Sequence, residues 1–192
     1  FQDEAYHIVV GQNETLVEAT TERGLYWARQ TLAQLTIDNK GKKTLPQCEI
    51  TDWPAFRIRG YMHDTGRSFI PFDELKKEIE ILSRFKINTF HWHLTENQAW
   101  RMESKLYPQL NAAKNMERDK GKFYTLKQAA ELADFCRAHN MTLIPEIDMP
   151  GHSAAFERTF GFGMQTEEGK RIMKDIISEV CDAIDVPWLH IG

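Results

Sequence analysis

The chain has 192 residues, 42% of them hydrophobic and 11% aromatic, which is enough apolar material for one sizeable core with a small appendage. Its formal charge of -4 at pH 7 and the lack of a long Lys/Arg run exclude nucleic acid as an expected partner and favour a small or neutral ligand. No stretch approaches the roughly 20 apolar residues that a membrane helix needs, so we expect no membrane span.

The ends and the cysteines add little chemistry. The start, Phe1 to Glu4, has neither an initiator Met nor the pattern of a signal peptide, and we expect it to be a cut end. Cys48, Cys136 and Cys181 are widely spaced and form no CxxC pair. We therefore expect buried or free thiols, no bound metal and no cofactor.

The first 45 residues predict part of a small α+β domain. Residues 5–10 and 14–19 have the pattern of short strands. The apolar residues of the next segment fall on one helical face: Leu25, Ala28, Leu32 and Leu35. Thr20 or Thr21 can supply the oxygen that caps this helix. A polar surface connection over residues 38–43 follows, and we place the domain boundary between residues 45 and 46.

Residues 46–192 predict an alternation of strands and helices. The strands are expected at residues 56–62, 87–94 and 141–147, with a fourth from 188, and the helices at 73–85, 125–139 and 167–184. Such an alternation implies parallel strands with right-handed crossovers. No GxGxxG or GxxxxGK[ST] motif follows the first strand, which favours a (β/α) barrel over a nucleotide-binding doubly wound sheet. The chemistry of a barrel lies at the carboxyl ends of its strands.

Histidines and carboxylates follow the second and third predicted strands. His91 and His93 share one face of the second strand, which would be the lumen of a barrel. The pair can be packed core histidines, or it can hold a metal as in metal-dependent amidohydrolases. After the third strand, a Pro-Gly turn is expected to bring His152 beside Asp148, where the carboxylate would fix the imidazole tautomer and support acid–base chemistry. The same Asp could instead make only an Asx hydrogen bond in a tight loop.

Arginines and tryptophans are the remaining candidates. Arg57 and Arg59 lie in the first predicted strand, where they are costly to bury without a carboxylate or a hydroxyl-rich ligand as a partner. Trp53, Trp92 and Trp100 offer aromatic faces that a sugar can stack on, although packing in a core is the commoner use of Trp.

Four motifs in order identify a resemblance. They are residues 59–67 (RGYMHDTGR), 91–101 (HWHLTENQAWR), 144–152 (IPEIDMPGH) and 190–192 (HIG). Together they closely resemble the successive strand motifs of glycoside hydrolase family 20, the β-N-acetylhexosaminidases. The similarity covers residues 45–192, and more weakly residues 5–37 resemble the end of the small domain that precedes the barrel in this family. The expected fold is α/β: the first half of a (β/α)8 TIM barrel, with about four strands and three helices, preceded by part of a small α+β domain.

The resemblance implies a retaining, substrate-assisted glycosidase. The substrate's own 2-acetamido carbonyl attacks the anomeric carbon and forms an oxazolinium intermediate. An Asp orients that acetamide, and the adjacent Glu acts as acid and then as base. In the family these two residues follow the His-Ile-Gly segment, so we expect them beyond Gly192. The parent enzyme would then release terminal N-acetylglucosamine or N-acetylgalactosamine from glycans, whereas this chain alone would be inactive.

The resemblance also assigns roles to residues. The substrate site is expected to include Arg59, Glu96, His93 and Trp100, with Arg59 on the hydroxyls of the terminal sugar. Asp148 and His152 would support the acid and the polarising carboxylate. Glu96 stands where the family more often has Asp, and its extra methylene changes its reach toward His152. His63 stands where an apolar residue is more usual and has no assigned role.

Two other functions are compatible with single motifs: an amidohydrolase-type barrel with a metal on His91 and His93, and a non-catalytic sugar-binding module. The expected partner is a glycan with a terminal N-acetylhexosamine. The open edges of a half barrel predict self-association. Family resemblance further implies that the parent enzyme is exported to the periplasm, the exterior or a lysosome-like compartment.

Overall fold

The computed structural model describes residues 2–192, and it divides into two compact units. Unit 1 contains the described residues up to Arg59 together with residues 81–88, and unit 2 contains residues 60–80 and 89–192. Phe1, part of the expected cut end, lies outside the described residues. Within residues 2–192, every helix is too short or too polar to cross a bilayer.

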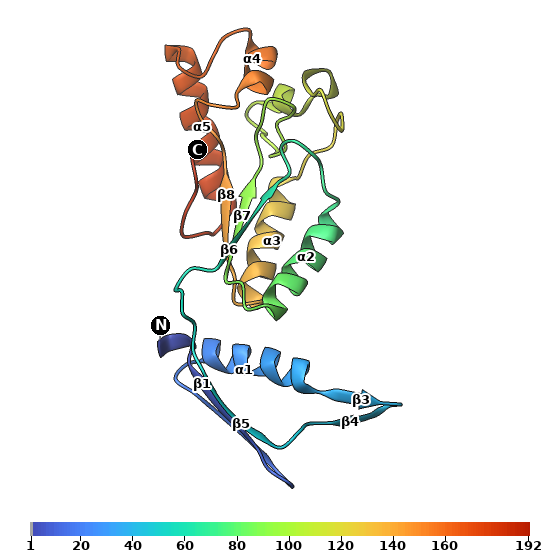
Figure 1. Cartoon of the computed structure of the whole chain (residues 1–192). Coiled ribbons are helices and arrows are strands. Elements are labelled where there is room, and N and C mark those ends of the chain that lie inside the picture. Colours follow the sequence, from blue (N-terminus) through green and yellow to red (C-terminus); the bar gives the residue numbers. More distant parts are fainter. Residues whose placement is uncertain (1) are drawn as a thin grey trace. The chain divides into compact units, whose positions relative to one another are not determined.

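Unit 1 is built on a small antiparallel sheet and one long helix (Figure 1). Its sheet has the order β2-β1-β5. In chain order its elements are the 3-10 turn η1 (Gln2–Glu4), β1 (Tyr6–Val10), β2 (Thr15–Ala19), α1 (Glu22–Leu35), β3 (Ile37–Asn39), β4 (Lys42–Thr44) and β5 (Cys48–Asp52). The two predicted strands and the predicted helix of this region are confirmed.

Alternation along β1 explains the core of unit 1. Tyr6, Ile8 and Val10 point to one face and are buried in one cluster with Trp27 and Ala28 of α1. Such burial contributes roughly 1.5–3 kcal/mol for each large side chain.

The start of α1 is fixed by two local features. The Thr21 side chain accepts hydrogen bonds from the backbone N–H groups of Arg23 and Gly24, as the sequence predicts. Gly24 is needed because a Cβ there would lie 2.5 Å from the Ala5 carbonyl oxygen.

Two elements of unit 1 differ from the prediction. The polar segment at residues 38–43 forms the β3–β4 hairpin, closed by a 2.8 Å hydrogen bond from the Gly41 N–H to Asp38 Oδ1 and by a left-handed Gly41 with φ 87°. Strand β5 follows the predicted boundary at residues 45 and 46, yet it pairs antiparallel with β1, so residues 48–52 complete the sheet of unit 1.

Unit 2 is built on three parallel strands in the order β6-β7-β8 (Figure 1). The strands are β6 (Gly60–Asp64), β7 (Thr89–His93) and β8 (Thr142–Glu146), and the helices are α2 (Phe72–Arg84), α3 (Leu126–Ala138), α4 (Ala154–Phe160) and α5 (Glu167–Ala183), with 3-10 turns η2 (Pro108–Asn111) and η3 (Ala113–Asn115). Each strand is joined to the next through a helix, which confirms the predicted α/β class and the partial barrel.

Side-chain caps fix the starts of α3 and α5. Thr125 and Gln128 form a complete capping box at the start of α3. The Thr166 side chain accepts from the Gly169 N–H at 3.0 Å at the start of α5, and Glu167 and Glu168 lie in its first turn, where the helix dipole favours negative charge.

Two strand predictions require correction. The first strand begins at Gly60 rather than at residue 56, because the Arg59 N–H donates to the Asn88 side-chain oxygen at 2.8 Å instead of to a neighbouring strand. The fourth strand is reduced to one parallel bridge between His190 and Glu146.

All three cysteines are free, and burial raises the pKa of the Cys136 thiol to about 12.

Candidate active site

The carboxyl ends of the three parallel strands bring polar side chains to one edge of unit 2. Asp64 is in register with His93, and His93 is in register with Glu146. These are the last residues of β6, β7 and β8. Because parallel strands end at the same edge, the loops that follow them supply the rest of the site.

The loop after β6 fixes an arginine beside two carboxylates. The Arg67 guanidinium donates to Asp64 Oδ2, and its other terminal nitrogen lies 3.1 Å from Glu96 Oε1. Burial alone would raise the pKa of Asp64, but hydrogen bonds from Arg67 hold it below its ordinary value. The Arg67 side chain remains 47% exposed, so a guanidinium with a fixed direction faces solvent at the strand ends.

Close packing in this loop depends on Gly66. A Cβ at this position would lie 2.7 Å from the Glu96 Cβ, and the Glu96 side chain is only 1% exposed. We therefore expect Gly66→Ala to displace Glu96 and to destabilise unit 2 by about 1–3 kcal/mol, measured by urea unfolding. The control is Gly60→Ala, whose Cβ would meet Thr89 at an ordinary 3.8 Å. Equal stabilities of the two variants would contradict this packing.

Residues 94–101 form a tight hairpin after β7. Thr95 and Trp100 make an antiparallel bridge, and the Arg101 N–H donates to the Leu94 carbonyl at 2.9 Å. Arg101 is 0% exposed, and its guanidinium donates to the carbonyl oxygens of four residues: Thr65 at 3.2 Å, Asp119 at 2.9 Å, Lys122 at 2.8 Å and Arg118 at 2.8 Å. One buried cation thus ties the loop after β6 to the segment before α3.

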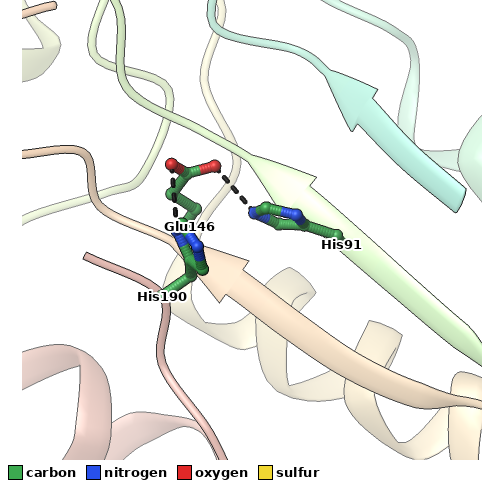
Figure 2. Close-up of side chains that lie close together, drawn as sticks. All are labelled: His91, Glu146 and His190. Carbon is green, nitrogen blue, oxygen red and sulfur yellow. Dashed lines mark hydrogen bonds and ion pairs between the residues drawn. The ribbon is translucent and has the colours of Figure 1, made fainter. Parts of the chain in front are cut away.

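Glu146 contacts three histidines, two of which, His91 and His190, are drawn with it in Figure 2. His91 Nε2 lies 2.7 Å and His93 Nδ1 2.8 Å from its Oε2, and His190 Nδ1 lies 3.1 Å from its Oε1. Burial alone would raise the pKa of Glu146, but the hydrogen bond from His93 and the charges of the neighbouring histidines hold it below its ordinary value. The Glu146 carboxylate therefore acts as an anion that holds the three histidines together at the strand ends.

This arrangement predicts a pH-dependent stability. Because the folded-state pKa of Glu146 is depressed, its contribution is complete above the unfolded value of about 4.5 and is lost as the pH falls through the folded value. We expect Glu146→Gln to lower the free energy of unfolding by a constant amount from pH 7 down to about pH 5, and the gap from wild type to narrow as the pH falls below about 4.5. Urea unfolding across this range measures the gap, and Glu131→Gln, in a surface ion pair, is the control. A gap that stays constant would contradict the assignment.

The turn after β8 places a carboxylate against a histidine. A cis Met149–Pro150 peptide and a left-handed His152, with φ 47°, fold the chain back so that His152 Nδ1 lies 2.7 Å from Asp148 Oδ2. The Asp148 N–H donates to Thr95 Oγ1 at 2.9 Å, which fixes the turn against the hairpin after β7. His152 Nδ1 is also 3.5 Å from Glu96 Oε2, so Glu96 reaches His152 despite differing from the family's usual Asp.

Comparison with known proteins decides the family. The model of the glycosyl hydrolase family 20 catalytic domain matches residues 56–165, which is more than half of the chain, and the model of domain 2 of that family matches residues 1–53. The chain belongs to glycosyl hydrolase family 20. The family resemblance of the sequence motifs is therefore confirmed.

Similar proteins cover most or all of these residues. A β-hexosaminidase of Porphyromonas gingivalis is 34% identical over 100% of this chain and 29% of its own length, and one of Vibrio furnissii is 36% identical over 79% of this chain and 27% of its own. An exo β-N-acetylglucosaminidase of Vibrio harveyi, solved with N-acetylglucosamine, has a TM-score of 0.93 and 28% identity, covering 99% of this chain and 36% of that one. The chain spans about a third of the length of these family 20 proteins.

Two residues that the sequence assigns to the sugar have their contacts within the protein. Arg59 belongs to unit 1, where its guanidinium donates to Glu4 and to the carbonyl oxygens of Lys86 and Phe56. The sequence offered a carboxylate or a hydroxyl-rich ligand as the partner of this arginine, and the structure shows a carboxylate, that of Glu4. Trp100 is 1% exposed, so neither face of its ring is open for stacking.

The remaining candidates come together, and two further residues join them. Glu96, His93, Asp148 and His152 all lie at the carboxyl edge of the sheet. Sequence reasoning missed Arg67 and Glu146 as site residues, although both lie inside the quoted family 20 motifs at the ends of strands.

His91 and His93 both contact Glu146 but fall in different groups of possible metal ligands, and family 20 membership replaces the amidohydrolase alternative. His63 pairs instead with Glu78 of α2 at 2.6 Å.

Proposed function

We propose that the protein hydrolyses terminal, non-reducing N-acetylhexosamine residues of glycans, with retention and with assistance from the substrate's acetamide. The single observation that carries this proposal is the Asp148–His152 pair, held at 2.7 Å at the carboxyl end of β8 within a family 20 catalytic domain. A carboxylate that fixes a histidine in this way orients the imidazole. The imidazole can then hydrogen-bond a neighbouring general acid while that acid gives up and regains its proton. The N-acetylglucosamine named in the Vibrio harveyi structure supports the same substrate class.

We assign the binding of the sugar hydroxyls to Arg67 instead of Arg59. Its guanidinium is anchored on one side by Asp64 and on the other by Glu96, and the side chain is 47% exposed. A planar fork of donors with a fixed direction suits two adjacent sugar oxygens. The donors of Arg59, in contrast, already bind Glu4 and backbone carbonyls.

We also propose that these 192 residues alone do not catalyse the reaction. Asp148 and His152 support a proton cycle, but the substrate-assisted scheme also needs one carboxylate on the acetamide and another on the leaving oxygen. We assign both to the Asp-Glu pair that follows His-Ile-Gly in the family pattern. The test compares nitrophenol release from a nitrophenyl N-acetyl-β-glucosaminide by the complete gene product and by the 192-residue chain. We expect activity only in the former, and turnover by the isolated chain would defeat the proposal.

Sugar binding without catalysis is the second candidate for the isolated chain. The fixed, half-exposed Arg67 favours it, because its anchors are complete within unit 2. Calorimetry with N-acetylglucosamine tests it: binding that is lost in Arg67→Met but kept in Arg59→Met supports the candidate. Heat that is unaffected by Arg67→Met would count against it.

We further propose that the 192-residue chain self-associates. Among the described residues, β6 pairs with β7 on one side only, and Tyr61 and Met62 of this edge strand are 40% and 54% exposed. An open, partly apolar edge offers unpaired backbone groups to a second chain. Light scattering after size exclusion should show dimers or larger species, and a monomer at all concentrations would refute this.

We also propose, from family membership, that the complete protein is exported, which cell fractionation would test.

A further inference from the structure

Two buried polar atoms within the candidate site face each other without a hydrogen bond. Within residues 2–192, His93 Nε2 and Glu96 Oε2 make no hydrogen bond. The two atoms are 3.8 Å apart, and their side chains are 6% and 1% exposed. Buried polar atoms usually have partners, and leaving one unsatisfied costs about 1–3 kcal/mol.

The contact with Glu146 leaves the second ring nitrogen of His93 directed toward Glu96. His93 Nδ1 lies 2.8 Å from Glu146 Oε2, and a carboxylate only accepts, so Nδ1 donates to it. The form of the ring that binds a metal ion through Nε2 has a lone pair on this atom, and Glu96 Oε2 offers a second lone pair 3.8 Å away. A cation between the two atoms would satisfy both.

Other side chains complete a ligand set around this position. His152 Nδ1 lies 3.5 Å from the same Glu96 Oε2, and the ligand atoms of His93, Glu96 and His152 all lie within 4.8 Å of one another. Asp148 Oδ2 is 2.7 Å from the same His152 Nδ1, so a metal ion on this nitrogen would replace that hydrogen bond. The His152 side chain is 46% exposed, which leaves a route from solvent.

We propose that His93, Glu96 and His152 form a binding site for a divalent transition metal ion, with Zn²⁺ as the best match. Zinc accepts imidazole nitrogen and carboxylate oxygen at about 2.0–2.2 Å in a tetrahedron, which separates neighbouring ligand atoms by about 3.4 Å. The observed separations of 3.8 Å and 3.5 Å are close to that value. The nearby group of His91, Glu146 and His190 fits less well, because its carboxylate is already engaged by histidines.

The site has a regulatory consequence, which rests on the proposed function. A metal ion on His152 Nδ1 takes this atom away from Asp148, so metal binding and support of the acid exclude each other. Zinc therefore acts as a reversible inhibitor of the complete enzyme.

The binding test uses the 192-residue chain and Zn²⁺ alone. Isothermal titration should give one site per chain, and Co²⁺ in place of Zn²⁺ should give the visible absorption of a tetrahedral ion. We expect Glu96→Gln and His152→Gln each to weaken binding about tenfold or more. His190→Gln and His7→Gln are the matched controls and should change binding less than twofold, while circular dichroism verifies that each variant is folded.

Each outcome decides one claim. A site that is unaffected by Glu96→Gln and His152→Gln, or that is lost only in His190→Gln, overturns the assignment. The absence of any binding also overturns it and leaves a water molecule as the donor between the two lone pairs. For the complete gene product, zinc inhibition reversed by a chelator supports the regulatory claim, and activity unchanged by saturating zinc overturns it. Failure of the proposed function is separate, since it would show as no glycosidase activity even in chelator.

Discussion

Replacing Asp148 with asparagine is expected to lower kcat of the complete enzyme about 100-fold or more. His152 Nδ1 lies 2.7 Å from Asp148 Oδ2, so the carboxylate holds the proton on Nδ1 and stabilises the imidazolium form. An asparagine has the same shape, but its amide can donate to Nδ1 and select the other tautomer.

Steady-state kinetics across pH on a nitrophenyl N-acetyl-β-glucosaminide measure this effect. The signature is a fall in kcat with a shifted acid limb of the pH profile and a KM changed much less, which a general loss of folding would not give. Asp185→Asn is the matched control, because the Asp185 side chain is 95% exposed. A variant at position 148 with wild-type kcat at every pH would remove Asp148 from the catalytic scheme.

Arg101→Met is expected to give the largest loss of stability, about 3–5 kcal/mol. The guanidinium is fully buried and donates to four backbone carbonyls in two separate segments of unit 2. Burial lowers the pKa of Arg101, which shows the cost of keeping this charge away from water. Methionine fills much of the same volume, but it removes the Arg101 donors from all four carbonyl oxygens, of which the Asp119 oxygen keeps the Lys122 N–H as a donor.

Urea unfolding monitored by tryptophan fluorescence measures this loss. Arg137→Met is the control, since the Arg137 side chain is 52% exposed in a surface pair with Asp134 and should change stability by less than about 1 kcal/mol. Similar unfolding midpoints for the two arginine variants would contradict the claim that Arg101 stabilises unit 2 by linking the loop after β6 to the segment before α3.

Elements with local signals could be predicted from the sequence. Helices α1 and α3 each have a threonine cap followed by an apolar stripe, and both begin where the caps place them. Strands β7 and β8 are short apolar runs, and their bounds differ from the prediction by one or two residues. The edge of unit 2 could be predicted as the site because it carries the family motifs at the ends of parallel strands.

Features that depend on distant partners could not be predicted. Strand β5 exists because β1 offers it an open edge, and Arg59 is held by Glu4, 55 residues away in the chain. Trp100 is buried by the hairpin to which it belongs and by neighbours such as Phe156. Arg67 differs from Arg59 only in its three-dimensional surroundings, so a sequence pattern with both arginines does not show which one faces the substrate.

The most direct test of the proposed function compares two substrates of the complete gene product. A nitrophenyl β-N-acetylglucosaminide carries the 2-acetamido group that the mechanism uses, and the matching β-glucoside has a hydroxyl in its place. We predict a kcat/KM at least about 1,000-fold higher for the first, since only its carbonyl can attack the anomeric carbon. Equal rates on the two substrates, or no hydrolysis of the acetamido sugar, would contradict the account.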